Sequence, residues 1–237
     1  MNRPSEAEWE QWNEEGYLVI EDALIGEELD RLQKAHTYWG EQCKDQWLDA
    51  VEAGDMIPNC FDIPDPFSKD EIFVDIVDHP SYYGYLLDFT DNNILFLAPQ
   101  VRAVPPWPIS YTRWHADSSH GRPLHIKVQV YVYDVDEAGA FGFVPGSHKE
   151  GSDLFRNYHH LKSMPGHKPL PGKAGTAIIF NSRGLHSAMD NPSSEPRRSV
   201  ILIYDKNEGQ STVDPRFEKI SHLCTTPERR RLFQLEI

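Results

Sequence analysis

Two residues with metal-binding side chains, His115 and Asp117, lie two positions apart near the middle of the chain. In an extended segment the side chains alternate between two faces, so an imidazole and a carboxylate at this spacing point to the same side. His186 is the best third ligand, because it follows one strand-like run (175–180) and precedes another (198–204). Two histidines and one carboxylate form the facial triad that holds Fe(II) and leaves other positions open for chemistry.

The order of the segments around these residues is more specific than the spacing itself, which 11 histidines could produce by chance. The segments are His115-x-Asp117, an apolar strand, the run from Gly139 to Pro145-Gly146-Ser147-His148-Lys149, then His186, and finally Arg197. This order resembles the phytanoyl-CoA dioxygenase family of Fe(II)- and 2-oxoglutarate-dependent oxygenases. The resemblance covers about residues 95–205, and residues 12–20 resemble the start of the family.

The resemblance implies a fold, a ligand set and a reaction. The fold would be a double-stranded β-helix, the jelly-roll of the cupin type, forming a single oxygenase domain over residues 1–237. Fe(II) would be held by His115, Asp117 and His186, with 2-oxoglutarate in two of the open positions and O2 in the third. The enzyme would oxidise, by hydroxylation, a small organic molecule and release succinate and CO2.

The distal carboxylate of 2-oxoglutarate needs a cationic partner, and the planar, permanently charged guanidinium of arginine suits it. Arg197 follows His186 by 11 residues, which matches the family spacing. Arg198 is adjacent, but only one of the two can face inward on a strand, and the family pattern favours Arg197. Ser187 and Tyr131 are further candidates for hydrogen bonds to the co-substrate, although core packing explains Tyr131 equally well.

Two other functions stay open at this point. A cupin-like metal-binding protein without oxygenase activity would keep the triad and lack the arginine, so Arg197 counts against it. An oxygenase of the prolyl-hydroxylase type would carry a lysine in that place, and none is found there after His186. His148 is a possible fourth ligand, but the resemblance places residues 145–149 in a structural turn. Five residues around His115 could shape a substrate pocket: Arg102, Trp107, Tyr111, Arg113 and Trp114.

The segments that must position these residues predict an antiparallel β-sandwich with flanking helices. Residues 123–133 alternate, with valines on one face and Lys127, Gln129 and Tyr131 on the other, which would line the interior beside the triad. Strands are also predicted at 17–20 and 94–104. Helices are predicted from the capping box at Ser5 to Gly16, over 29–54, 72–77 and 82–89, and from Thr226 onward. Residues 151–174 show little periodicity and predict a mobile lid that contains His159 and His160.

The composition narrows the function further. A net charge of −14 argues against a nucleic-acid surface, because phosphate contacts need clustered lysines and arginines. Three widely spaced cysteines favour free thiols in a reducing compartment over a disulfide framework. The acidic N-terminus does not resemble a signal peptide, and no apolar run approaches the ~20 residues that span a bilayer. We therefore expect a cytoplasmic enzyme, monomeric or homodimeric, that binds neither membranes nor nucleic acids.

Overall fold

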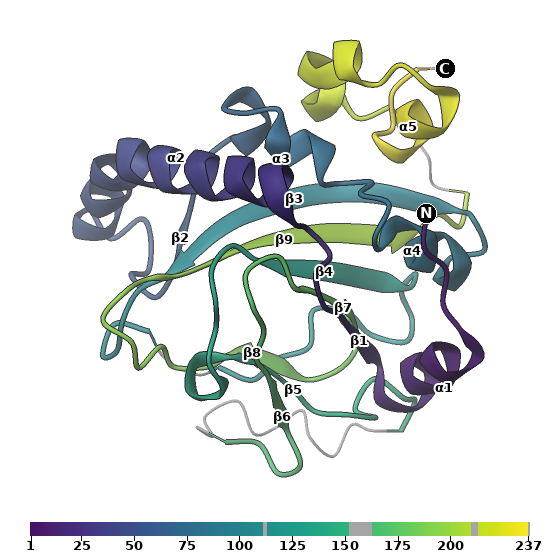
Figure 1. Ribbon diagram of the computed structural model, residues 1–237, viewed down its shortest axis with the longest axis horizontal. Helices are drawn as coiled ribbons and strands as arrows, with labels where there is room; N and C mark the ends of the chain where they lie inside the picture. Colours follow the sequence, from purple (N-terminus) through teal and green to yellow (C-terminus); the bar gives the residue numbers. More distant parts are fainter. Residues whose placement is uncertain (111–112, 152–162, 210–212, 237) are drawn as a thin grey trace.

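Two antiparallel sheets face each other in this computed structural model, which describes residues 1–110, 113–151, 163–209 and 213–236 (Figure 1). The larger sheet has the order β1 (Tyr17–Ile20), β7 (Ala177–Asn181), β4 (His125–Tyr131), β9 (Arg197–Lys206), β3 (Ile94–Val104) and β2 (Phe61–Asp62). The smaller sheet has the order β6 (Lys168–Leu170), β5 (Phe141–Phe143) and β8 (His186–Ala188). This is the predicted antiparallel sandwich.

Helices cover the outer face of the larger sheet (Figure 1). They are α2 (Gly26–Glu52), α3 (Ile72–Asp75) and α4 (Tyr83–Phe89), while α1 (Glu6–Glu15) precedes the edge strand β1 and α5 (Pro227–Leu232) lies against β3. Short 3-10 helices occupy Pro66–Ser68, Glu137–Gly139 and Pro215–Leu223. No helix among the described residues is long and apolar enough to cross a membrane.

The alternation of β4 has the predicted orientation. Val128 and Val130 belong to the main core under the helices, whereas Tyr131 packs with Phe141 and Leu170 of the smaller sheet. The space between the sheets is therefore lined by the more polar face of β4. Since apolar burial contributes roughly 25 cal/mol per Å², the valine face fixes which side chains of this strand point inward.

The predicted structural turn at residues 145–149 packs against the N-terminal segment. Gly16 ends α1 in the left-handed conformation with φ 87°, and a Cβ built on it would overlap the His148 ring. The Ser147 hydroxyl donates to the Val144 carbonyl (2.6 Å) and accepts from the Leu185 amide (2.8 Å). These bonds fix the chain just before His186, so the turn is structural.

Several short elements differ from the sequence prediction. Part of the predicted lid, residues 152–162 with His159 and His160, lies outside the described residues. Within the rest of that stretch, Lys168–Leu170 forms the edge strand β6 and pairs with β5. Neither this strand nor β2 and β8, of two and three residues, is long enough to show a period of two. The prediction of a loop over residues 151–174 was therefore wrong at Lys168–Leu170.

Candidate metal centre

Backbone hydrogen bonds bring the two ligand segments together. The His115 amide donates to the His186 carbonyl (3.1 Å), and the His186 amide donates back to the His115 carbonyl (2.9 Å). The Asp117 amide donates to the Ser182 carbonyl (2.9 Å). The segment of His115 thus runs antiparallel to β8 and is extended, which is the geometry that the two-residue spacing required.

The three side chains converge on one point. Ligand atoms of His115, Asp117 and His186 all lie within 4.8 Å of one another. The Nε2 atom of His186 is 3.0 Å from Asp117 Oδ2, and the Nε2 atom of His115 is 3.6 Å from Asp117 Oδ1. Phe180 and Phe141 pack beside the His186 ring, with ring centroids 4.9 and 5.6 Å away. Aromatic rings therefore cover the side of the centre beside His186. The other side is formed by His115, whose side chain is 41% exposed.

The protonation of both imidazoles suits a metal ion. The Nδ1 atom of His115 lies 2.8 Å from the Arg113 carbonyl, and the Nδ1 atom of His186 lies 2.9 Å from the Gly184 carbonyl. A carbonyl oxygen only accepts, so both Nδ1 atoms carry a proton and both Nε2 atoms present a lone pair to the centre. The 3.0 Å contact between Nε2 of His186 and the Asp117 carboxylate needs a proton or a metal ion to offset the repulsion between the lone pairs of the two groups. The donor set therefore fits Fe(II).

The surroundings of the centre favour the neutral imidazole of His115 and the ionised carboxylate of Asp117, which are the forms that bind a metal ion. Burial and the neighbouring His186 lower the pKa of His115 to about 4, so its imidazole is neutral at neutral pH. Partial burial raises the pKa of the Asp117 carboxyl, but His186 and Lys127 outweigh this effect and hold that pKa well below its usual range. Lys127 Nζ lies 2.9 Å from Asp117 Oδ2. The alternation of β4 predicts Lys127 on the inner face but indicates no role for it.

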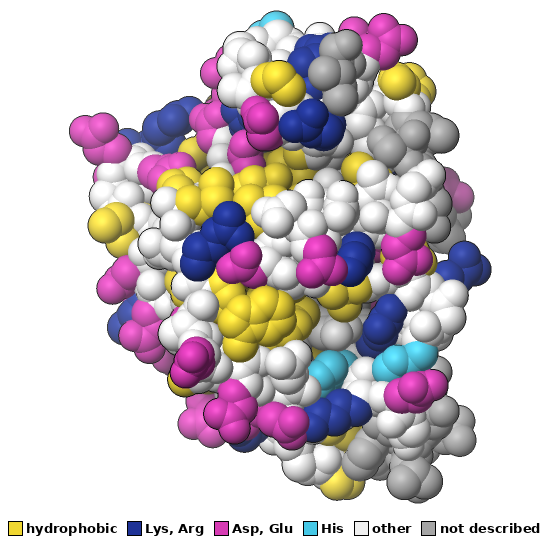
Figure 2. All heavy atoms as spheres, turned by 90° about the vertical axis from the view of Figure 1, so that its right-hand side faces the viewer, with side chains coloured by type: hydrophobic (Ala, Val, Ile, Leu, Met, Phe, Trp, Pro, Cys, Tyr) yellow, Lys and Arg dark blue, Asp and Glu magenta, His cyan; other side chains and the backbone are white. Residues whose placement is uncertain are grey.

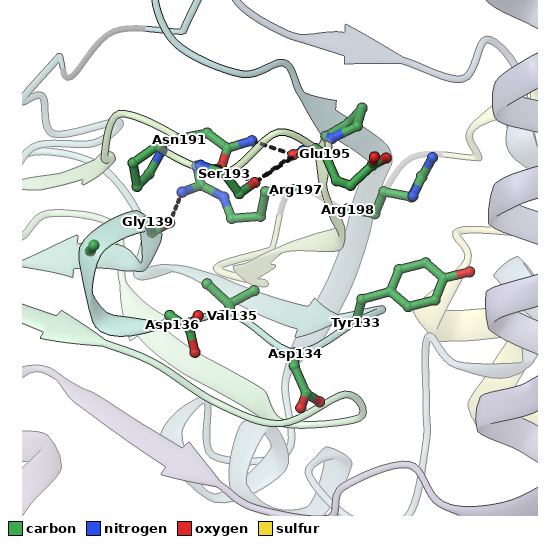
Figure 3. Close-up of a pocket in the computed structure, with 13 residues that line it drawn as sticks. Tyr133, Asp134, Val135, Asp136, Gly139, Asn191, Ser193, Glu195, Arg197 and Arg198 are labelled. Carbon is green, nitrogen blue, oxygen red and sulfur yellow. Dashed lines mark hydrogen bonds between the residues drawn. The ribbon is translucent and has the colours of Figure 1, made fainter.

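Arg197 is a buried cation that is not among the three converging side chains. The residue is 7% exposed, and its guanidinium donates to the Gly139 carbonyl (Figure 3) and to the Met189 carbonyl at 3.2 Å. No described carboxylate pairs with it. Burial lowers the pKa of Arg197, the charge of Arg102 lowers it further, and Tyr131 opposes this shift. A buried guanidinium without a carboxylate partner is suited to an anionic ligand.

Arg198 points the other way. Figure 3 shows Arg197 turned toward Gly139 and Arg198 directed away from it, beside Tyr133. The Arg198 guanidinium lies 5.5 Å from the centre of the Tyr133 ring. Arg197 shares its face of β9 with Ser199, which pairs with Tyr131 of the inner face of β4. The predicted choice of Arg197 therefore agrees with the register of β9.

Comparisons with known proteins agree with this geometry. The family model described as phytanoyl-CoA dioxygenase matches residues 12–199. The chain belongs to the phytanoyl-CoA dioxygenase family. The match confirms the resemblance that the order of the motifs indicates.

Among curated relatives, an L-proline trans-4-hydroxylase of Streptomyces griseoviridis is 24% identical over 128 residues, which are 43% of this chain and 48% of that protein. The chain thus spans about half the length of this relative. An ectoine dioxygenase of Streptomyces avermitilis is 22% identical over 242 residues, which are 88% of this chain and 81% of that protein. The names of both relatives give small organic molecules as their substrates.

Solved structures confirm the predicted jelly-roll fold of this family member. The crystal structure of SnoK, a non-heme alpha ketoglutarate dependent carbocyclase from nogalamycin biosynthesis, superposes with a TM-score of 0.65 and 19% identity, covering 86% of this chain and 84% of SnoK. EctD from S. alaskensis with bound Fe gives a TM-score of 0.62 and 19% identity, covering 85% and 76%. At these identities the likeness concerns the fold alone.

The two remaining predicted co-substrate residues of this dioxygenase-family chain are engaged with the backbone. The Ser187 hydroxyl accepts from the Arg113 amide (2.9 Å). The Tyr131 hydroxyl donates to the Leu170 carbonyl (2.7 Å) and accepts from the Phe141 amide (3.0 Å). Both residues are fully buried, and their bonds join the segments around the centre. A direct role for either in co-substrate binding stays a prediction.

A cavity of about 520 Å³ opens beside His115. Its lining residues are Asn59, Cys60, Arg102, Val104, Arg113, His115, Ser187 and Ala188. Of the predicted pocket residues, Arg102 and Arg113 line it, whereas Trp114 is buried in a small cluster and Trp107 is 64% exposed. Tyr111 lies outside the described residues. The sequence carries no signal for Asn59 and Cys60, because they reach the cavity only through the pairing of β2 with β3.

Proposed function

We propose that this chain is an Fe(II)- and 2-oxoglutarate-dependent dioxygenase, a single domain over residues 1–237 that oxidises a small organic molecule. The observation that carries the proposal is the convergence of His115 Nε2 and His186 Nε2 on the Asp117 carboxylate, with each Nδ1 atom beside a backbone carbonyl. When bound there, Fe(II) supplies the oxidative decarboxylation of 2-oxoglutarate with O2, which yields succinate, CO2 and the oxidant for the substrate. The protein residues orient the reactants and exclude water around this chemistry.

Arg197 is the proposed anchor of 2-oxoglutarate. It is the buried guanidinium on the inner face of β9, and the described carboxylates leave it without an ion pair. When 2-oxoglutarate binds, its distal carboxylate would replace the carbonyls of Gly139 and Met189 as the partner of the Arg197 guanidinium. A cupin-like metal-binding protein without oxygenase activity would have no use for this buried charge.

The cavity beside His115 is the proposed substrate site. Its volume of about 520 Å³ is suited to a small molecule, since ligand sites commonly measure about 300–1,000 Å³. Ectoine and L-proline, the molecules that the names of two relatives give, are of this class. The Arg102 guanidinium in its wall is already paired with Asp62 through two bonds of 2.7 and 2.6 Å.

The proposal also covers the binding partners, the cellular location and the oligomeric state of the enzyme. On the face shown in Figure 2, lysines and arginines are interspersed with aspartates and glutamates, with no continuous basic patch among the described residues of that face. This favours a protein without a nucleic-acid partner. Free thiols at Cys43, Cys60 and Cys224 favour the reducing cytoplasm. We expect a monomer or a homodimer.

Metal analysis tests the proposal. The purified protein should bind one Fe(II) per chain, and 2-oxoglutarate should bind only to the metal-loaded form. His115→Ala and His186→Ala should each remove most of the metal affinity, because each deletes one of three protein ligands. The matched control is His148→Ala, a buried histidine in the structural turn that does not reach the centre. Full iron occupancy in both ligand variants would refute the assignment.

A further inference from the structure

A buried lysine binds one oxygen of the metal-ligating carboxylate. Lys127 is 9% exposed on the inner face of β4, which pairs with β7 on one side and β9 on the other. Its Nζ atom lies 2.9 Å from Asp117 Oδ2, the same oxygen that lies 3.0 Å from His186 Nε2. Asp117 is the only carboxylate within salt-bridge distance of Lys127 in the described part of the chain.

The pairing of Lys127 with Asp117 is hard to break. A buried ammonium that loses its partner carries the cost of an unpaired charge, which is several kcal/mol in mutational experiments. The next inward side chains along β4, Gln129 and Tyr131, are neutral and offer no substitute charge. Lys127 should therefore stay bound to Asp117 when a metal ion occupies the centre.

A carboxylate can bind a metal ion through one oxygen or through both. The bond from the Lys127 ammonium draws electron density from Oδ2 of Asp117 and uses one of its lone pairs, so it disfavours chelation of the metal by both oxygens at once. We propose that Lys127 is a positioning residue that restricts Asp117 to coordination through one oxygen and so keeps a position open for 2-oxoglutarate. This role rests on the proposed function, because it concerns the same metal centre.

The positive charge of Lys127 predicts the direction in which the metal affinity changes when this residue is replaced. An ammonium and a divalent cation repel each other while sharing one carboxylate, so Lys127 should weaken metal binding. Removing the ammonium should strengthen metal binding and at the same time impair the binding of 2-oxoglutarate. A residue that merely stabilised the fold would show the opposite effect on the metal, since its loss would loosen the centre.

The test compares Lys127→Met with Lys127→Arg and with Thr90→Val. Thr90 is fully buried at the end of α4 and donates to the Leu86 carbonyl, so it controls for the loss of a buried polar side chain away from the inner face of β4. Mn(II) affinity is measured by electron paramagnetic resonance of the free ion. Affinity for 2-oxoglutarate is measured anaerobically on the Fe(II)-loaded protein from the visible absorption of the chelate.

We expect Lys127→Met to bind Mn(II) at least tenfold more tightly than the wild type and to bind 2-oxoglutarate at least tenfold more weakly. Lys127→Arg keeps the charge and should restore both affinities to within about threefold, and Thr90→Val should change neither. Should Lys127→Met fail to fold, Lys127→Gln tests the same loss of charge.

Unchanged affinity for 2-oxoglutarate in the uncharged variants would overturn the role of Lys127, whatever their metal affinity. Weaker Mn(II) binding in those variants would overturn it too. A wild-type protein that binds no metal would instead overturn the proposed function, and the inference with it. The two failures are therefore distinguishable from the wild-type measurement alone.

Discussion

At the scale of single residues, Arg197 and Arg198 are neighbours in sequence that lie on opposite faces of β9. We therefore expect their replacements to affect 2-oxoglutarate binding differently. Arg197→Ala should weaken 2-oxoglutarate binding while leaving the metal in place. Deleting one partner of a buried charge pair costs about 2–5 kcal/mol, which corresponds to a loss of roughly 30-fold or more. Calorimetric titration of the metal-loaded protein with 2-oxoglutarate measures this change.

Arg198→Ala is the control that the sequence itself offers. Its guanidinium contacts the Tyr133 ring on the other side of the sheet, so its loss should leave the co-substrate affinity within about twofold. If Arg198→Ala weakened 2-oxoglutarate binding and Arg197→Ala did not, the inward face of β9 would be wrongly assigned by one residue.

At the scale of elements, the junction of α1 and β1 depends on a glycine. Gly16→Ala should destabilise the protein by about 3 kcal/mol, because the left-handed conformation costs about 1–2 kcal/mol for alanine and the new Cβ would overlap the His148 ring. Gly26→Ala is the matched control, since Gly26 also has a positive φ of 56° but a Cβ there meets nothing within 4 Å. Urea unfolding should show about twice the loss for Gly16→Ala. Equal losses would mean that the turn at His148 moves aside freely.

Helix α2 carries an acid-sensitive residue into the core. His36 is 1% exposed, its Nε2 atom lies 3.2 Å from the Arg102 carbonyl, and burial lowers its pKa to about 4. Between pH 6.5 and 4 the unfolded chain binds this proton and the folded chain does not, so stability falls as the pH falls through that window. The loss from His36 between pH 7 and 5 should be about 2 kcal/mol.

Replacing His36 by Leu should remove that part of the pH dependence. The measurement is the free energy of unfolding in urea at pH 7 and pH 5, for the wild type, His36→Leu and His222→Leu. His222 is exposed, and its replacement controls for the loss of a histidine as such. An identical pH dependence in the wild type and His36→Leu would show that His36 is not the source.

The elements also show how far the sequence could predict the fold and the site. Long periodic segments were predictable: the alternation of β4, the capping box before α1 and the helical repeat of α2 each follow from burial of one face. The two-residue spacing of His115 and Asp117 predicted their convergence, because alternate side chains of an extended segment point to the same side. The bond between Lys127 and Asp117 was not predictable, because it depends on how the segment before β4 folds back over that strand. Asn59 and Cys60 reach the cavity through a strand of two residues, which leaves no pattern.

At the scale of the whole molecule, a bound metal ion should stabilise the fold by linking residues of the two sheets. His115 and Asp117 lie on the connection between β3 and β4 of the larger sheet, whereas His186 lies in β8 of the smaller one. Mn(II) at 100 times its Kd should stabilise the folded chain by about 2.7 kcal/mol and raise Tm by roughly 5–10 °C. Differential scanning calorimetry with and without Mn(II) measures the shift, and EDTA should reverse it. A similar shift in His186→Ala would show that the ion binds elsewhere.

The reciprocal amide–carbonyl bonds between His115 and His186 bear on the loss and recovery of a metal ion. These bonds hold the two ligand segments together through peptide groups alone, so the arrangement of the ligands does not depend on the metal ion. If the chain works as proposed, a molecule that loses its iron should keep the site for the next ion. Activity lost in this way should then return on addition of Fe(II) and a reductant, without refolding.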